Sequence, residues 1–208
     1  LGVYSMNDDP LDKKQEILLK QQIKKLSKKN HLVVTSDYSH GFISANNAKI
    51  ISQLKKFTSV NAQLNSSNLG FHTLQNYRKI NSVIINESEI RHEMRNKHDK
   101  IEVLMKKLSI KLKMKVLIVT KGKDGAILYD QKNKKFYYSP AFAKKITDKI
   151  GAGDSMLSLI SPALFLGYDF HLVMLLGSLA ASFSVQSIGN KRNMNKIDFL
   201  KALKHIIA

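Results

Sequence analysis

The chain has 208 residues, 43% of them apolar, no cysteine, and a formal net charge of +18 from 34 Lys and Arg against 16 Asp and Glu. This length and apolar share suit one domain with a substantial core, and the lack of cysteine excludes disulfides and thiolate metal sites. Neither a membrane-spanning apolar run nor a secretory signal is recognisable, so we expect no membrane partner and a cytoplasmic location.

The positive charge admits nucleic acid, a membrane surface or phosphorylated small molecules as partners. Lysines are scattered through the predicted helices and loops with few aromatic residues among them, and no nucleic-acid-binding motif is present. Scattered lysines are most often ordinary solvated residues. We therefore expect no nucleic acid partner, and a basic nucleic-acid-binding protein is kept as an alternative that a salt-dependent gel shift would test.

The first predicted element is a helix that Asp9 caps and Pro10 opens, and that ends near residues 28–30. A short apolar strand follows over 31–36 and delivers Asp37 at its carboxyl end. Ligands of open α/β sheets bind outside the carboxyl ends of strands, so Asp37 is a candidate substrate contact. Capping of the turn after the strand is the alternative role for this carboxylate.

A helix over 46–55 and a strand over 57–61, which ends at Asn61, come next. The loop 63–68 is rich in amide and hydroxyl groups, which suit a polyol or phosphate site and equally an ordinary surface loop. A further helix is expected over 70–79.

The next strand, over 82–85, delivers Asn86 and Glu89 to the same edge of the sheet. Three residues apart in a starting helical turn, the two side chains share a face. A carboxylate and an amide there are able to hold water around a magnesium ion. A capping box, with Asn86 as the cap and Glu89 at the third helical position, uses the same geometry, so the sequence leaves both interpretations open.

An amphipathic helix carrying Ile101, Leu104 and Leu108 precedes a buried strand over 116–120. The turn that follows leads into a strand over 126–129, which we expect to be antiparallel, and 135–138 adds another. Thr120, Gly122 and Gly125 fall in and around this turn. This turn either passes close to a bound nucleotide or is an ordinary hairpin that needs no ligand.

The run Gly151-Ala152-Gly153-Asp154 leads into an apolar stretch and indicates a tight turn that starts a helix. Small residues let the backbone amides converge, and the first amides of a helix lack internal partners and carry the positive end of its dipole. This combination suits a phosphate. Asp154 then stands where a carboxylate takes a proton from a hydroxyl aimed at that phosphate. The alternative is a glycine turn with Asp154 as a helix cap.

Two more helices are expected, over 170–187 and 195–207. Strands thus alternate with helices, and polar motifs recur at strand ends. The pattern predicts an α/β fold with a parallel or mixed sheet covered by helices on both faces.

With these motifs in this order, the chain resembles the ribokinase-like carbohydrate kinases, also called the phosphofructokinase-B family. The resemblance rests on Asn86-x-x-Glu89, on Thr120-x-Gly122-x-x-Gly125 and on Asp148-x-x-Gly151-Ala152-Gly153-Asp154, and it covers nearly all of residues 1–208. It implies one partial domain with the three-layer α/β/α ribokinase-like (Rossmann-like) fold, whose N-terminal part and lid are missing. The segments 37–41 and 188–190 resemble most the heptose-phosphate kinase branch, some of whose members are fused to a nucleotidyltransferase.

The resemblance implies ATP-dependent phosphorylation of a sugar hydroxyl, with Asp154 as the catalytic base. Gly151, Ala152 and Gly153 would form the anion hole, and Asn86 and Glu89 would organise Mg²⁺ and phosphate. Thr120, Gly122, Gly125, Gly189 and Asn190 would border the nucleotide, while Asp37 and Asn61 would face the acceptor. The backbone oxygens at Asp148 and Ile150 resemble a monovalent-cation (K⁺) loop, although Lys149 replaces the usual threonine there.

Two further expectations come from the family. Its members form dimers through the lid, so a homodimer is one expected assembly. Loss of the N-terminal part, which supplies most sugar contacts, admits a catalytically inactive nucleotide- or metabolite-binding module of the same fold as the alternative function.

Overall fold

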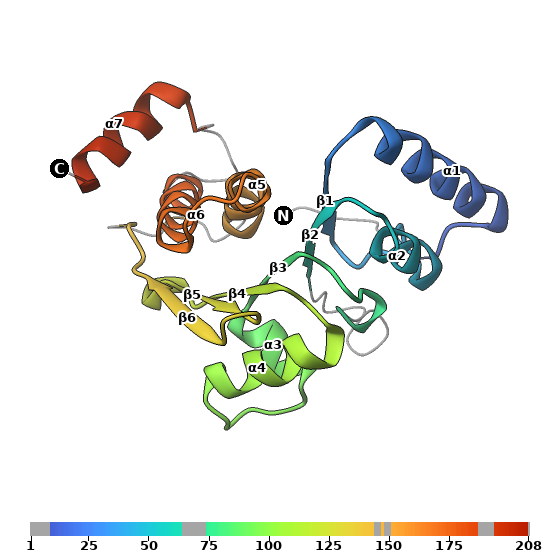
Figure 1. The fold of residues 1–208 in the computed structure, drawn as a ribbon, viewed down its shortest axis with the longest axis horizontal. Helices are drawn as coiled ribbons and strands as arrows, with labels where there is room; N and C mark the ends of the chain where they lie inside the picture. The colour runs from blue at the N-terminus through green and yellow to red at the C-terminus, as the bar shows by residue number, and fades with distance from the viewer. Residues whose placement is uncertain (1–8, 64–73, 144–146, 148–150, 187–193, 208) are drawn as a thin grey trace, which may run out of the picture.

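The structure is a computed structural model of the chain, and it describes residues 9–63, 74–143, 147, 151–186 and 194–207 (Figure 1). It contains a six-stranded sheet whose strands follow one another in sequence order. The strands are β1 (Leu32–Asp37), β2 (Phe57–Ala62), β3 (Ser82–Asn86), β4 (Val116–Thr120), β5 (Ala126–Asp130) and β6 (Lys135–Ser139). β1 to β4 are parallel to one another, whereas β5 pairs antiparallel with β4 and β6 pairs antiparallel with β5. The predicted mixed sheet is confirmed.

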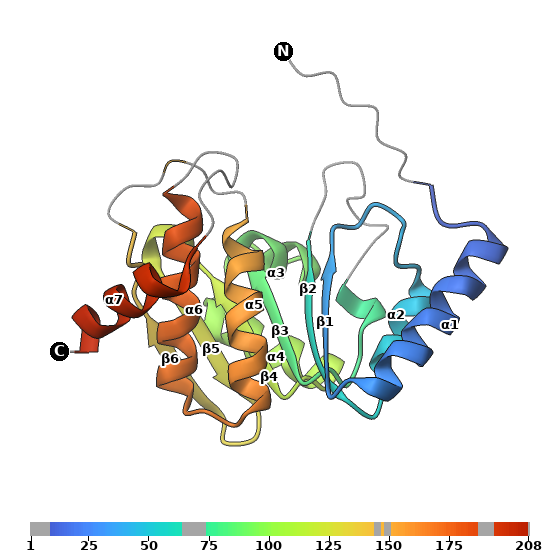
Figure 2. The same ribbon diagram turned by 90° about the horizontal axis from the view of Figure 1, so that it is seen from above.

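Helices lie on both faces of this sheet (Figures 1 and 2). One face carries α5 (Ala152–Phe165) and α6 (Phe170–Val185), and the other carries α2 (Ala45–Ser52), α3 (Glu87–Glu93) and α4 (Ile101–Leu112). The outer helices α1 (Lys13–Lys29) and α7 (Lys196–Ile207) pack on α2 and α6. The arrangement is the expected three-layer α/β/α fold.

Alternate residues of the central strands supply two separate cores. In β4, Leu117 and Val119 belong to the core under α2, α3 and α4, whereas Val116 and Ile118 belong to the core under α5 and α6. Successive side chains of a strand point to opposite faces, so a strand covered on both sides must be apolar throughout. This requirement explains the uninterrupted apolar run from 116 to 119.

Three predicted elements differ from the structure by three residues or more. α1 begins at Lys13 rather than Pro10, because Asp12 and Gln15 form a reciprocal capping box there. α2 ends at Ser52, three residues earlier than expected. The part of the predicted 70–79 helix that the structure describes holds only a 3₁₀ turn at Leu74–Asn76, because Tyr77 turns into the core, where its hydroxyl donates to Asp37.

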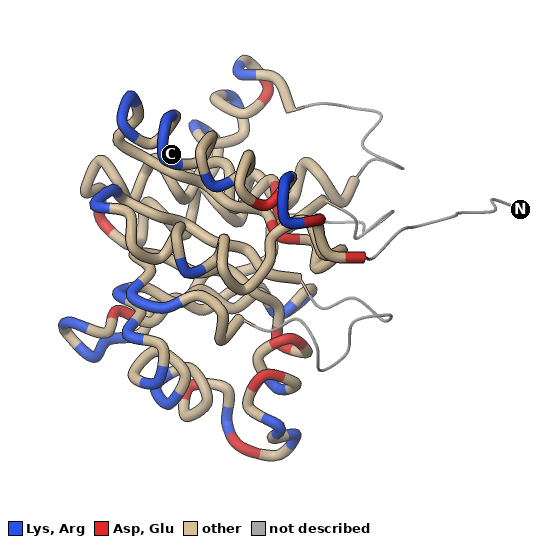
Figure 3. The backbone as a smooth tube through the Cα atoms, turned by 90° about the vertical axis from the view of Figure 1, so that its right-hand side faces the viewer, with Lys and Arg blue, Asp and Glu red and all other residues tan. Residues whose placement is uncertain are grey.

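Two further features of the structure are the distribution of its basic residues and the lengths of its helices. Lys and Arg occur on several elements rather than along one strip in the view of Figure 3. Within the part of the chain that the structure describes, no helix has the length and apolar character needed to span a bilayer.

Candidate active site

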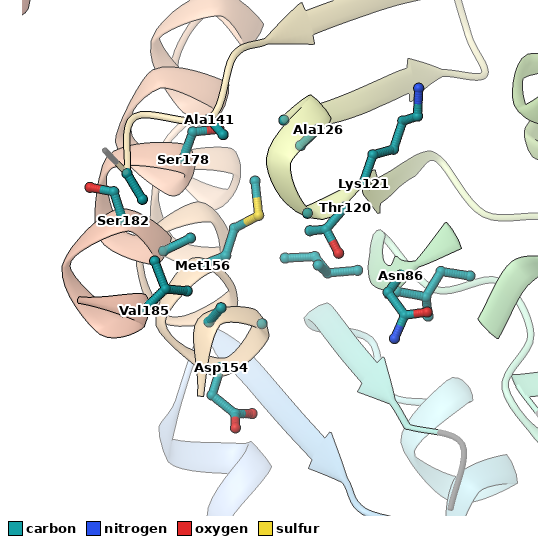
Figure 4. Close-up of a pocket in the computed structure, with 18 of the residues that line it drawn as sticks. Asn86, Thr120, Lys121, Ala126, Ala141, Asp154, Met156, Ser178, Ser182 and Val185 are labelled. Atoms are coloured by element: carbon teal, nitrogen blue, oxygen red, sulfur yellow. The ribbon is translucent and has the colours of Figure 1, made fainter. Parts of the chain in front are cut away.

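A cavity of about 870 Å³ opens at the carboxyl edge of the parallel strands, between the helix pair α5–α6 and the ends of β3 and β4 (Figure 4). Most of the described residues that the sequence singled out line it: Asn61, Asn86, Glu89, Thr120, Gly122, Gly125, Gly151, Ala152, Gly153 and Asp154. The other predicted positions Asp148, Ile150, Gly189 and Asn190 lie outside the described residues. Asp37 is described and is not part of the cavity wall.

The first turn of α5 forms one wall of the cavity. Gly151 precedes the helix with a φ of 81°, a left-handed conformation that glycine adopts without strain, and Ser155 donates its amide to the Gly151 carbonyl at 2.9 Å. Within the described part of the chain, no acceptor is seen for the backbone amides of Ala152 and Gly153. A methyl group added at Gly153 would meet only the Asn61 amide nitrogen, at 3.8 Å. The wall thus presents the first amides of a helix with open space beside them, which suits an anion.

The carboxylate of Asp154 is held by two hydroxyls from the carboxyl end of β1 and the residue just after it. Ser36 donates its hydroxyl to Oδ1 at 2.7 Å, and Tyr38 donates its hydroxyl to Oδ2 at 2.8 Å. The hydrogen bond to Asp154 raises the pKa of the Tyr38 hydroxyl. Sequence reasoning missed Ser36 and Tyr38, although their spacing of two at a strand end places both side chains on one face.

Asp37, between them, points to the opposite face and is only 3% exposed. Its Oδ2 accepts a 2.6 Å hydrogen bond from the buried Tyr77 hydroxyl, and its Oδ1 accepts the amide of Ser39 at 3.0 Å. These contacts match the turn-capping alternative rather than a substrate contact. They fix the chain at the point where it leaves the sheet.

Asn61 lies at the point where β2 and β3 separate. The two strands pair at Ser59–Ser82 and Val60–Val83, and the Asn61 side chain then donates to the Ile84 carbonyl at 2.8 Å. Its Oδ1 is buried and has no hydrogen-bond partner among the residues that the structure describes. An unsatisfied buried acceptor on a cavity wall is a place for a donor from water or a ligand.

Asn86 and Glu89 form the capping box that the sequence allowed. Asn86 Oδ1 accepts the Glu89 amide at 2.8 Å, and Glu89 Oε2 accepts the Asn86 amide at 2.7 Å. Both residues also line the cavity, with the Asn86 side chain drawn at its edge in Figure 4. A role toward a hydrated metal ion is therefore compatible with the cap, because a carboxylate offers further acceptor positions.

The turn from β4 to β5 closes the far side of the cavity. Lys121 donates its amide to the Gly125 carbonyl at 2.7 Å, so the turn is a closed hairpin. Gly122 has a φ of 60° and open space where a side chain would stand, whereas a methyl group at Gly125 would lie 2.0 Å from the Ser139 carbonyl oxygen. Gly125 is thus required for folding, and Gly122 leaves backbone exposed to the cavity.

Small side chains of α6 form the remaining wall. Ser178, Ala181, Ser182 and Val185 line the cavity, and three of them are labelled in Figure 4. The Ser178 hydroxyl is buried, and no described residue forms a hydrogen bond with it. The sequence predicted this helix but gave it no part in the site. The cavity brings together the start of α5, the Asp154 carboxylate and the small side chains of α6.

No cluster of three or more His, Asp or Glu that would hold a metal by protein ligands alone occurs among the residues described. Mg²⁺ commonly keeps several waters and takes one or two carboxylates together with phosphate oxygens. Glu89 at the cavity wall provides one such carboxylate.

Comparison with known proteins gives a consistent result. The model of the pfkB family carbohydrate kinases matches residues 4–197. An uncharacterized sugar kinase of Buchnera aphidicola subsp. Schizaphis graminum is 30% identical over 196 residues, which are 86% of this chain and 60% of that protein. The bifunctional protein HldE of Psychromonas ingrahamii is 26% identical over 188 residues, 89% of this chain and 38% of that protein.

Solved structures support the fold. Arabidopsis thaliana ribokinase, complexed with ribose and ATP, superposes with a TM-score of 0.70 at 19% identity, covering 96% of this chain and 61% of that one. The chain thus spans about 60% of the length of the relative and of the ribokinase. With the family model matching nearly the whole chain and the ribokinase fold present, this chain belongs to the pfkB family of carbohydrate kinases.

Proposed function

We propose that the chain transfers the γ-phosphoryl group of ATP to a hydroxyl of a sugar or sugar phosphate, with a heptose phosphate as the favoured class of acceptor. The observation that carries the proposal is the position of Asp154. Its carboxylate stands at the start of α5, in the same cavity as the amides of Ala152 and Gly153. A base and an anion hole are thereby side by side, as phosphoryl transfer requires.

In this mechanism Asp154 takes the proton of the acceptor hydroxyl, and the acceptor oxygen attacks the γ-phosphorus. The bond between that phosphorus and the bridging oxygen breaks, and ADP leaves with the electron pair. The amides of Gly151, Ala152 and Gly153 bind the oxygens of the group in transit. Free amides aimed at developing charge contribute about 3 kcal/mol each in comparable anion holes.

The nucleotide would lie along Thr120, Gly122 and Gly125, against the small residues of α6. The open backbone at Gly122 and the unpaired Ser178 hydroxyl support this placement. Gly189 and Asn190 would complete the adenine side. Asn86 and Glu89 would hold hydrated Mg²⁺, which supplies neutralisation of phosphate charge when bound. Backbone oxygens at Asp148 and Ile150 would hold K⁺.

Asn61 is proposed on the acceptor side through its unsatisfied Oδ1. Asp37 would act indirectly, since its oxygens hold Tyr77 and Ser39. We also propose that residues 1–208 form part of one ribokinase-like domain of a longer kinase, with a lid-mediated homodimer and a fused nucleotidyltransferase as its expected context.

The decisive variant is Asp154→Asn, assayed for MgATP binding by calorimetry and for phosphoryl transfer to a panel of sugars and sugar phosphates. We expect MgATP affinity to stay within about twofold of the wild type, whereas transfer falls by about a hundredfold or more, the usual contribution of a general base. Asp169→Asn is the matched control. Asp169 also starts a helix and caps it through the amide of His171, but it lies outside the cavity. Equal transfer rates in Asp154→Asn and wild type would refute the assignment.

A second candidate is a nucleotide- or metabolite-binding module without catalysis. It is favoured by one fact, the coverage of only 60% of the sugar kinase relative. The same assay separates the two candidates. MgATP binding with no transfer to any acceptor in the panel would support the module.

A further inference from the structure

The end of β1 places three consecutive side chains in an alternating pattern. Ser36 and Tyr38 both reach Asp154, whereas Asp37 between them is buried on the opposite face against Tyr77. The main chain here is held at two further points, since Gln63 donates its amide to the Asp37 carbonyl at 2.8 Å and Ser39 donates its hydroxyl to the Gln63 carbonyl. The two hydroxyls are therefore presented to Asp154 by a fixed strand end.

The two hydroxyls differ in their relation to the cavity. Tyr38 lines the cavity and is 49% exposed, whereas Ser36 is half-buried and is not part of the cavity wall. Because Tyr38 lines the cavity and Ser36 does not, we infer that Oδ2 of Asp154, which Tyr38 holds, is the oxygen nearer the cavity. An acceptor hydroxyl that enters the cavity has to approach this same oxygen to be deprotonated.

We propose that Tyr38 is a specificity-determining residue that covers the cavity-side oxygen of Asp154 until an acceptor displaces it, and so keeps water from using the base. The inference rests on the proposed function. Ser36 is then a positioning residue, because it holds Oδ1 and fixes the plane of the carboxylate in both states. In this geometry the Tyr38 hydroxyl covers one oxygen of the Asp154 carboxylate, and the Ser36 hydroxyl holds the other.

The competing reaction defines what Tyr38 prevents. When water reaches Oδ2, Asp154 removes a proton from it, and the water oxygen attacks the γ-phosphorus of ATP. The bond to the bridging oxygen breaks, so the products are ADP and inorganic phosphate. Water is small and abundant, and a free base beside a bound triphosphate would hydrolyse it. Only an acceptor that brings its own binding contacts is able to replace the Tyr38 hydroxyl.

Displacement requires little movement. The main chain on both sides of Tyr38 is anchored through Asp37 and Ser39, and about half of the ring already faces solvent. Rotation of the side chain alone uncovers Oδ2, and such rotations of exposed side chains are fast. Ser36 has no comparable freedom at its half-buried position in the strand.

The test measures phosphate release from MgATP with no acceptor present, in the wild type and in three variants. Tyr38→Phe keeps the ring and removes the hydroxyl. We expect it to hydrolyse MgATP about tenfold faster than the wild type, the factor that corresponds to one lost hydrogen bond to a charged group. Ser36→Ala leaves Oδ2 covered and is expected to be no faster than the wild type. Tyr168→Phe is the matched control, because Tyr168 is 48% exposed at the other end of α5.

A gain of rate is the informative readout, because a variant that merely loosens the fold would lose activity. MgATP binding is measured on the same samples. Normal binding with no increase in Tyr38→Phe overturns the role of Tyr38 and leaves the kinase assignment intact. An equal increase in Ser36→Ala also overturns it, because the effect would not then depend on the cavity side. Failure of the wild type to bind MgATP rejects the proposed function and this inference together.

Discussion

At the scale of single residues, two aspartates are used in different ways because different elements surround them. Asp37 is buried between the turn after β1 and the Tyr77 ring, so its oxygens are occupied by Ser39 and Tyr77. Asp154 stands at a cavity wall and meets two hydroxyls from a strand more than a hundred residues away in the chain. A carboxylate in the first position stabilises the fold, and one in the second is available to a ligand.

The Tyr77–Asp37 hydrogen bond leads to a prediction about stability and pH. Replacing Tyr77 by Phe leaves a buried carboxylate short of one donor, which should cost about 1–3 kcal/mol of unfolding free energy at neutral pH. Burial, together with the nearby Asp37, raises the pKa of the Tyr77 hydroxyl. A raised folded-state pKa contributes stability in full below the unfolded-state value of about 10, and the contribution is lost as the pH rises above it.

Urea denaturation of wild type and Tyr77→Phe at several pH values checks both parts. The stability gap between them should be constant up to about pH 9 and should narrow above about pH 10, because only the wild type gains an ionising tyrosine on unfolding. Tyr168→Phe, at an exposed hydroxyl, should show almost no gap. A gap that widens in alkali would contradict the assigned direction.

Two glycines of the cavity wall should respond differently to the same substitution. Gly153→Ala has room for its methyl group, with Asn61 Nδ2 the nearest atom at 3.8 Å, so it should fold normally. The methyl group stands beside the anion-binding amides, and weaker donation there should lower MgATP affinity or transfer by about a hundredfold.

Gly125→Ala places its methyl group 2.0 Å from the Ser139 carbonyl oxygen and should instead lower thermal stability. Thermal melts and MgATP calorimetry on both variants distinguish the two effects. Unaltered binding and transfer in Gly153→Ala would count against an anion hole at this helix start.

At the scale of elements, close packing of α5 against α6 sets one side of the cavity. A methyl group at Gly177 would lie 2.4 Å from Ile160 Cδ1 and 3.0 Å from Met156 Cγ. The two helices therefore approach each other where α6 has no side chain. The small residues Ser178 and Ser182, next to this contact, can then line the cavity. The Ala- and Ser-rich composition of α6 thus serves both packing and the site.

Gly177→Ala should overpack this contact and lower the free energy of unfolding by about 1–3 kcal/mol. Because the closest atom is the end of the flexible Ile160 side chain, Ile160→Val removes it and should restore part of the loss in the double variant. Urea denaturation of the two single variants and the double variant measures the coupling. Strictly additive effects would show that the two residues are not in contact.

At the scale of the whole molecule, the two ends of the sheet differ. At one end β5 and β6 form an antiparallel pair against α6, and at the other β1 pairs, within the described part of the chain, with β2 alone. Val34 on β1 is 45% exposed. A strand with a free edge offers unpaired amides and carbonyls to another segment. Within the described residues, β1 therefore leaves one edge open to pairing with another segment.

Most of the fold followed from the sequence because its signals are local. Each of the predicted strands overlaps an observed strand. A run of four or five apolar residues between turns indicates a strand that is buried on two faces. The helix over 70–79 failed in its described part because Tyr77 enters the core and binds Asp37, a partner 40 residues away. The start of α1 was misplaced for a local reason, because Asp12 forms a capping box with Gln15 three residues after the predicted cap at Asp9.

The sequence by itself determined which residues gather at the carboxyl edge, because strand direction and the Gly151–Asp154 turn are short-range properties. Only the tertiary structure decided that Asp154, and not Asp37, lines the cavity. It also decided that Ser36 and Tyr38 hold Asp154 across separations of 118 and 116 residues. The physical reason is that hydrogen bonds between distant segments depend on how the layers pack, and no local periodicity encodes them.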